Sequence, residues 1–266
     1  MTSDRSQTWT RHWREYLIEA GALGTFMVSA CAFSALLWHP ASVVVAAVPE
    51  AFTRRVLTGL AMGLTAIAIV YSPFGQRSGA HLNPCVTVTF TRLGRVDPRD
   101  AVCYVVAQFV GGFVGVSVAA ALLGDWAAHD AVRFAVTVPG PLGVAPAFLA
   151  ELAISFGMMT AVLIVSNSAC ARWTGVVAGT LVAIYITVES PISGMSMNPA
   201  RSLGSALAAR HLTDQWIYFV APLLGMLLAA EAYVRVRGCD RVACAKIDHI
   251  DREPCIFCDY HLARRS

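Results

Sequence analysis

The chain has 266 residues, of which 56% are hydrophobic and only 14% are charged. A soluble domain usually carries about 25% charged residues, so this composition excludes an ordinary soluble fold and indicates a protein of the lipid bilayer. The formal net charge of +3 is small, and we expect no nucleic-acid partner.

Six apolar segments are long enough to cross a bilayer, because a span needs roughly 20 mostly apolar residues. In chain order they lie at about 16–38, 55–73, 101–123, 146–167, 173–189 and 216–236. Two shorter apolar pieces, at about 83–93 and 198–209, cannot cross and are expected to be re-entrant half-helices. The sequence therefore predicts an all-α membrane protein of six transmembrane helices and two half-helices.

The positive charges in the short loops predict the orientation of these spans. They gather before the first span, in the loops after the second and fourth, and after the sixth. These residues are Arg5, Arg11, Arg14, Arg77, Arg92, Arg95, Arg99, Arg172, Arg235, Arg237, Arg241 and Lys246. With six spans all of these segments share one side, so we expect both termini to be cytoplasmic and the protein to lie in the cell (plasma) membrane.

One short phrase occurs in both halves of the chain. Residues 78–84 read Ser-Gly-Ala-His-Leu-Asn-Pro, and residues 193–199 read Ser-Gly-Met-Ser-Met-Asn-Pro. Paired Gly/Pro interruptions in matching places of a membrane chain are typical of inverted repeats with a site near the bilayer midplane. We therefore expect two inverted repeats, at about 14–123 and 146–237.

The Asn-Pro pairs predict where the half-helices begin, since Asn favours the N-cap and Pro the first helical position. In inverted repeats the starts at Asn83 and Asn198 approach from opposite faces and meet near the midplane. Each start carries a partial positive charge. A midplane flanked by two such ends is hostile to cations and protons, while the Asn amides offer N–H donors to a passing molecule.

Four segments resemble the aquaporin (major intrinsic protein) family. They are the boxes at 78–87 and 197–206, the third span at 104–115 and the sixth span at 216–225. The resemblance covers about residues 14–236. It implies a passive channel for water, a pore in each protomer, a lipid-embedded homotetramer and no catalysis, and it places a junction of the two half-helices at Asn83, Pro84, Cys85, Asn198, Pro199 and Ala200.

The resemblance also implies a selectivity filter of four residues. These are Met62, Ile186, Met195 and Arg201. Water-selective members typically have His and an aromatic ring here, so three apolar walls favour other small uncharged solutes as well: glycerol, ammonia, urea or hydrogen peroxide. Ser202, in contrast, is typical of the water-type branch. A secondary transporter, which also uses broken helices, is the alternative of a different class.

Two carboxylates, Glu19 and Glu151, recur at equivalent places in the first and fourth spans. A carboxylate inside the membrane needs partners. The resemblance implies that both brace the re-entrant loops by accepting backbone N–H bonds, and that His81 contributes to bracing or lines the pore. A proton relay is the alternative role for the carboxylates.

The composition changes after the sixth span, and we divide the chain into an N-terminal segment (1–13), a channel domain (14–237) and a tail (238–266). The family resemblance does not reach the tail. We expect no cofactor, with zinc binding in the tail as the alternative. Its candidate ligands are Cys244, His249, Cys255, Cys258 and His261. A sensor with a metal-binding output is a third class of function.

Overall fold

The structure is a computed structural model, and it describes residues 11–249 and 255–258. All regular elements in these ranges are helices. The α-helices are α2 (Trp13–Trp38), α3 (Val43–Ala47), α4 (Ala51–Tyr71), α5 (Pro73–Ser78), α6 (Pro84–Arg92), α7 (Pro98–Leu123), α8 (Asp125–Ala128), α9 (Val144–Ser166), α10 (Thr174–Val188), α11 (Ser190–Ser193), α12 (Pro199–Ala208) and α13 (Ile217–Arg237). Three 3₁₀ turns are η1 (Arg133–Ala135), η2 (Ala171–Trp173) and η3 (Cys239–Arg241).

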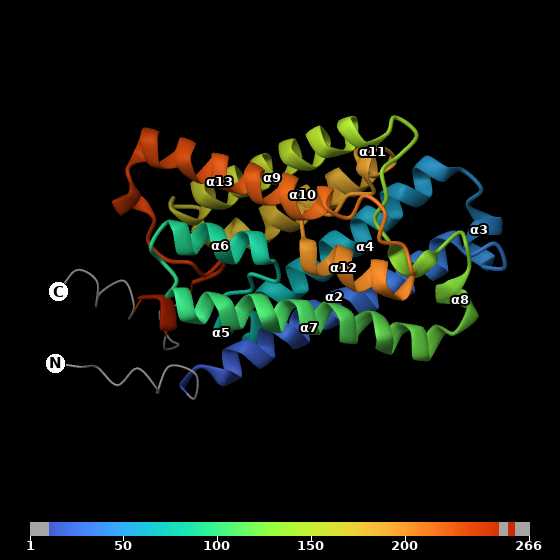
Figure 1. Cartoon of the computed structure of the whole chain (residues 1–266), viewed down its shortest axis with the longest axis horizontal. Coiled ribbons are helices and arrows are strands. Elements are labelled where there is room, and N and C mark those ends of the chain that lie inside the picture. Colours follow the sequence, from blue (N-terminus) through green and yellow to red (C-terminus); the bar gives the residue numbers. More distant parts are fainter. Residues whose placement is uncertain (1–10, 250–254, 259–266) are drawn as a thin grey trace.

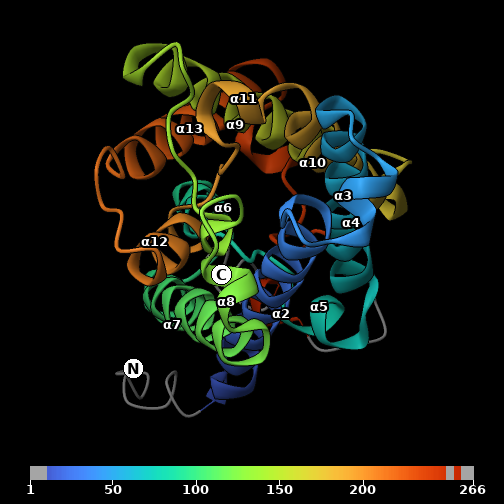
Figure 2. The ribbon, with the colours of Figure 1, turned by 90° about the vertical axis from the view of Figure 1, so that its right-hand side faces the viewer.

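The long helices run roughly along the long axis of the molecule (Figure 1); they are α2, α4, α7, α9, α10 and α13. Within the described residues, six helical segments are long and apolar enough to cross a membrane, which confirms the six predicted spans. Viewed along that axis, the helices form a ring (Figure 2). We call the end with residues 239–249 the tail side, and the opposite end, with α3 and α8, the far side (Figure 1).

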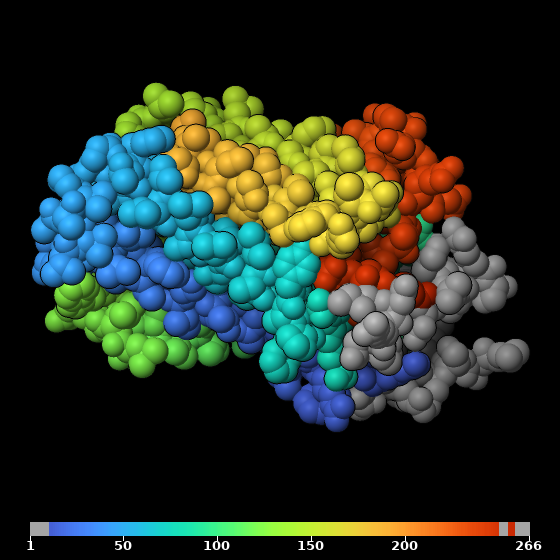
Figure 3. Space-filling view, turned by 180° about the vertical axis from the view of Figure 1, so that it is seen from behind, coloured from blue at the N-terminus to red at the C-terminus, as the bar shows by residue number. Residues whose placement is uncertain are grey.

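The helix contacts repeat between the two halves. In the first half α2 packs along α7, and in the second half α9 packs along α13. Helices α4 and α10 join the halves and lie side by side on one face of the molecule (Figure 3). The matching pairs α2–α7 and α9–α13 are what two structural repeats require. The short helices α6 and α12 lie between the long ones (Figure 1).

The half-helices begin where the sequence predicts. Asn83 is the N-cap of α6 and Asn198 is the N-cap of α12, and each is followed by Pro at the first helical position. The Asn side chains accept hydrogen bonds from backbone N–H groups of the first turn, as N-caps do. The sequence analysis did not predict α5 and α11, the short helices that precede each re-entrant loop.

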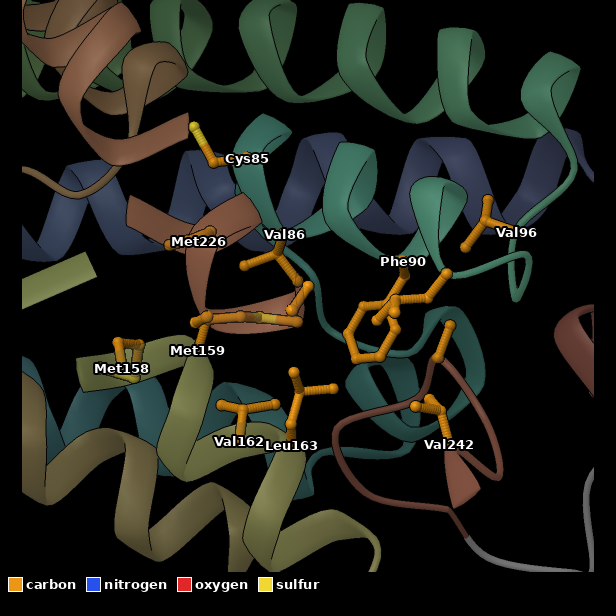
Figure 4. Packing of buried hydrophobic residues seen from close by; sticks show 14 of the residues in the cluster. Cys85, Val86, Phe90, Val96, Met158, Met159, Val162, Leu163, Met226 and Val242 are labelled. Atoms are coloured by element: carbon orange, nitrogen blue, oxygen red, sulfur yellow. The ribbon is translucent and has the colours of Figure 1, made fainter. Parts of the chain in front are cut away.

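The largest apolar cluster surrounds the first half-helix. Val86 and Phe90 of α6 point toward Met159 and Leu163 of α9, whereas Cys85, in the same cluster, points away from them (Figure 4). Val242 lies in the same cluster, so the segment after α13 packs into the core of the channel domain instead of standing apart from it.

Glycines allow the backbones of crossing helices to touch. A Cβ on Gly111 of α7 would lie 2.1 Å from the Ala20 carbonyl oxygen of α2, and a Cβ on Gly115 would lie 2.4 Å from the Gly24 oxygen. Small residues at such crossings are typical of membrane helices, because packing replaces the hydrophobic driving force there.

We therefore expect Gly111→Ala to push α2 and α7 apart and to destabilise the fold by roughly 1–3 kcal/mol, the usual cost of overpacking. Gly21→Ala is the matched control, because no atom lies within 4 Å of a Cβ placed there. Thermal unfolding in detergent, followed by circular dichroism, measures both. Equal melting temperatures for the two variants would contradict the packing assigned to Gly111.

Candidate pore and its lining

The two half-helix starts are tied together by reciprocal hydrogen bonds. The Asn83 amide donates from Nδ2 to the carbonyl oxygen of Met197 at 2.6 Å. The Asn198 amide donates from Nδ2 to the carbonyl oxygen of Leu82 at 2.7 Å. A side-chain amide carries two N–H donors. Each asparagine therefore keeps a second N–H besides the one bonded to the opposite loop.

The loops that precede the half-helices share one backbone conformation. In the first loop Gly79, Ala80 and Leu82 have φ values of 96°, 53° and 53°. In the second, Gly194, Met195 and Met197 have φ values of 84°, 52° and 55°. Positive φ is uncommon outside glycine, so four non-glycine residues in matching places mark a backbone that tertiary contacts hold in place.

Two buried carboxylates hold these loops. Glu19 accepts hydrogen bonds from the His81 and Leu82 amides at 3.1 and 2.7 Å, from Ser78 Oγ at 2.8 Å and from Gln108 Nε2 at 2.9 Å.

Glu151 repeats the arrangement in the second half. It accepts from the Ser196 and Met197 amides at 2.6 and 2.8 Å, and from Ser193 Oγ at 2.7 Å. Backbone bonds to irregular loops at membrane depth must be made within the protein. Both carboxylates therefore occupy bracing positions.

A cavity of about 560 Å³ runs past the Asn pair. Its lining includes Asn83 and Asn198, and it extends from Trp38 on the far side to Ile247 on the tail side. All four residues assigned to the filter by resemblance line this cavity: Met62, Ile186, Met195 and Arg201. The structure thus brings together residues from α4, α10, the second loop and α12.

Within the described residues, Arg201 Nη1 is buried and has no hydrogen-bond partner. A guanidinium carries five N–H donors, so the donors on Arg201 Nη1 can bind a polar molecule in the cavity. The fixed positive charge also disfavours cations there.

Several lining residues were not predicted from the sequence. Trp38 and Arg55 come from α2 and α4 and line the far side of the cavity. Trp38 is held by its indole N–H, which donates to Thr58 Oγ1 at 3.1 Å, and by the Arg54 guanidinium 4.7 Å above its ring. Neither residue belongs to a motif, so no local signal marked them.

The remaining junction residues are mostly packed rather than exposed to the cavity. Cys85 is 2% exposed and lies in the apolar cluster, and Ala200 is fully buried against Gly112 of α7. Pro84 and Pro199 occupy the first helical positions of α6 and α12. They shape the junction, whereas the Asn side chains and Arg201 present its polar groups.

His81 lies on the tail side of the junction and is buried. Its Nδ1 is 3.0 Å from Thr87 Oγ1, and its Nε2 is 2.9 Å from the carbonyl oxygen of Ala245. It lines the cavity and also fixes the segment after α13 to the first loop. The sequence analysis did not predict the second contact, because Ala245 lies outside the family resemblance.

Four of the five candidate metal ligands in the tail come together. Possible ligand atoms of Cys244, His249, Cys255 and Cys258 all lie within 4.8 Å of one another. A hydrogen bond with Cys244 is the largest cause that lowers the pKa of the Cys255 thiol to about 5. The fifth candidate, His261, lies outside the described residues.

With the fold and the cavity in place, comparison with known proteins identifies the family. The model of the family described as "Major intrinsic protein" matches residues 5–233. The chain is 33% identical over 192 residues to "Aquaporin NIP1-2" of Arabidopsis thaliana, covering 70% of this chain and 65% of that protein. It is 37% identical over 175 residues to "Aquaporin NIP3-1" of Zea mays, covering 65% and 56%.

The chain belongs to the major intrinsic protein family. Its matches span less than two thirds of the length of these curated relatives, 65% of the Arabidopsis protein and 56% of the maize protein. The fold is also similar to the X-ray structure of the aquaglyceroporin from Plasmodium falciparum, with a TM-score of 0.68 and 21% identity over 85% of this chain and 96% of that one.

We expect Glu151→Ala to unfold the second loop, because it leaves the Ser196 and Met197 amides buried without an acceptor. Each such amide costs about 1–3 kcal/mol. The control is Glu231→Ala, which breaks an exposed pair with Arg92 and costs little. Thermal unfolding in detergent checks both variants, and a Glu151→Ala protein as stable as the control would exclude the bracing role.

Proposed function

We propose that the protein is a passive transmembrane channel for water and other small uncharged solutes, and that it excludes ions and protons. The observation that carries the proposal is the meeting of two helix N-termini beside one continuous cavity, with Asn83 and Asn198 in its lining. Both helix ends carry partial positive charge, and Arg201 adds a full one. A cation at this point meets repulsion without a compensating ligand, whereas an uncharged molecule finds hydrogen-bond donors.

Proton exclusion follows from the same donors. A water molecule that accepts hydrogen bonds from the Asn amides has its oxygen engaged, so it cannot accept a proton from its neighbour in the file. The fields of the two helix ends oppose a positive charge from either direction. The chain of waters is thereby interrupted at the junction.

A second candidate, a channel mainly for larger neutral solutes, is favoured by the filter. Met62, Ile186 and Met195 contribute apolar walls to the cavity that Arg201 also lines. Such walls can contact the carbon skeleton of a polyol or urea while Arg201 binds its polar group. The similar Plasmodium falciparum structure is titled an aquaglyceroporin, which agrees with this candidate.

The hydrogen bonds of the two buried carboxylates, Glu19 and Glu151, disfavour a secondary transporter. Coupled transport requires groups free to bind a coupling ion near the midplane. Each oxygen of Glu19 and of Glu151 accepts at least one hydrogen bond from a loop or a neighbouring helix. Because these carboxylates hold the loops, we assign them no transport step and no proton relay.

For the membrane setting, we propose a homotetramer in the cell (plasma) membrane with the tail side and both termini cytoplasmic. The charge distribution of the loops supports this orientation. Bilayer lipid and neighbouring protomers would cover the apolar residues exposed on the long helices, such as Leu60, Val106 and Leu149.

Stopped-flow light scattering on proteoliposomes tests the function. We expect osmotic water flux above that of empty liposomes, with a low activation energy, and no accompanying proton flux under a pH gradient. Glycerol, urea and ammonia gradients in the same vesicles rank the neutral solutes. No flux above empty liposomes for any of these molecules would refute the channel.

Replacing the filter charge tests selectivity. We expect Arg201→Val to raise proton or monovalent cation leak, because the charge that repels cations is lost from the cavity. Arg210→Val, at an exposed position after α12, is the control and should leave the leak unchanged. Fluorescent pH indicators trapped in proteoliposomes report the leak. Undiminished exclusion in Arg201→Val would remove this role from Arg201.

Narrowing the filter tests the second candidate. We expect Ile186→Trp to lower glycerol permeability more than water permeability, since pore width limits the larger solute first. Ile184→Trp is the matched control, because this residue of the same helix is 47% exposed on the outer surface. The measured quantity is the ratio of the two permeabilities. A ratio that stays constant in Ile186→Trp would show that this residue does not line the narrow part.

A further inference from the structure

The segment after α13 is built into the tail-side end of the molecule. The Ala243 amide donates to Asn167 Oδ1 at 2.7 Å, and the Ile247 amide donates to the Gly79 carbonyl oxygen at 3.1 Å. Gln76 Nε2 donates to Asp248 Oδ2 at 2.9 Å. These contacts lie on the loop after α9, the first re-entrant loop and α5, so the segment crosses three parts of the channel domain.

Aromatic packing fixes the described part that follows, residues 255–258. The Phe257 ring is 1% exposed and stacks on the His81 ring, with centroids 5.2 Å apart and planes 10° from parallel. It also meets Tyr104 edge-on at 5.8 Å. A Cβ on Gly79 would lie 2.8 Å from Phe257, so the loop glycine leaves room for this ring.

Four potential metal ligands converge between these two anchored pieces. Cys244 Sγ lies 3.5 Å from Cys255 Sγ and 3.6 Å from Cys258 Sγ. His249 Nε2 lies 3.2 Å from Cys258 Sγ. All four cysteine and histidine atoms are within 4.8 Å of one another. A cavity of about 250 Å³ reaches Cys244, His249 and Cys258, so an ion can approach them.

The separations suit one tetrahedral ion. With Zn–S bonds of about 2.3 Å and Zn–N bonds of about 2.0 Å, tetrahedral geometry places ligand atoms about 3.5–3.8 Å apart. The observed sulfur separations fall in or near this range, and the cysteines are free thiols. Three thiolates and one imidazole form a standard ligand set of structural zinc, with no position left open for catalysis.

A buried lysine provides an independent observation. Lys246 is 2% exposed, and within the described chain its Nζ has no hydrogen-bond partner. A buried ammonium is costly unless an opposite charge lies near it. Zn²⁺ with three thiolates and a neutral imidazole carries a net charge of −1, and Lys246 follows Cys244 by two positions, with its amide 3.5 Å from Cys244 Sγ. A zinc–thiolate centre would balance this charge.

We propose that Cys244, His249, Cys255 and Cys258 bind one structural Zn²⁺ ion, which holds residues 243–249 and 255–258 against the tail-side mouth of the cavity. Residues 243–249 form no regular helix or strand, and metal binding supplies folding energy to such pieces. Two of its apolar residues depend on that placement: Phe257, which covers His81, and Ile247, which lines the main cavity.

Metal content of the full-length protein, purified without an affinity tag, tests the site. We expect about one zinc per chain by elemental analysis. Cobalt exchanged into the site should show the visible absorption of tetrahedral Co²⁺ and a thiolate charge-transfer band. Cys255→Ser should lose stoichiometric metal. Cys239→Ser, in the same tail but outside the cluster, should keep it.

Replacing His249 disturbs the packing least among the four ligands, because its side chain is exposed. His249→Ala should lose metal, whereas His249→Cys should restore it with a stronger thiolate band, as a four-cysteine site requires. A wild-type protein that takes up neither Zn²⁺ nor Co²⁺ stoichiometrically, or a Cys255→Ser variant with undiminished zinc, would overturn the site.

Hydrogen exchange tests the placement of the tail. Chelation of the zinc should accelerate amide exchange in residues 243–249, where the Ile247 amide is bonded to Gly79, and leave α2 and α9 unchanged. Identical exchange with and without metal would refute the holding role. Neither experiment measures permeation, so failure of this proposal leaves the proposed channel standing, and the reverse also holds.

Discussion

The structure depends on two hydrogen bonds, from each half-helix asparagine to the loop that precedes the other half-helix. They place two positive helix ends together at membrane depth, which no single repeat could do. The cost is irregular backbone on both sides of the junction. Glu19 and Glu151 offset it by accepting the loop amides, and Tyr104 and Tyr218 donate their hydroxyls to the Ser78 and Ser193 carbonyls.

This arrangement separates two roles that polar groups can play in a membrane. The carboxylates are satisfied by the loops and hold backbone in an uncommon conformation. Arg201 and the second N–H of each asparagine keep donors available to the cavity. In the channel that we propose, a cavity lined by donors and positive charge, with the carboxylate oxygens bonded within the protein, would favour uncharged molecules. In the same proposal, the apolar side chains of Met62, Ile186 and Met195 would leave the choice among those molecules to the width of the cavity.

The tail adds a part that the family resemblance did not reach. It contacts both the first re-entrant loop and the loop after α9. Its Ala245 carbonyl accepts a hydrogen bond from His81 Nε2. The tail-side mouth is therefore shaped jointly by the repeats and by a segment with its own ligand cluster. Ile247 lies in the cavity wall, so the tail forms part of the lining at this end.

The sequence by itself determined the six spans, both half-helices and their capping residues, because hydropathy and N-cap preference act over neighbouring residues. The family resemblance also singled out Met62, Ile186, Met195 and Arg201, which the structure places in the lining of one cavity. Only the tertiary structure decided the positive φ of Ala80, Leu82, Met195 and Met197, the far-side lining by Trp38 and Arg55, and the gathering of Cys244 with Cys255. These features depend on contacts between residues distant in the chain, and no local preference specifies such contacts.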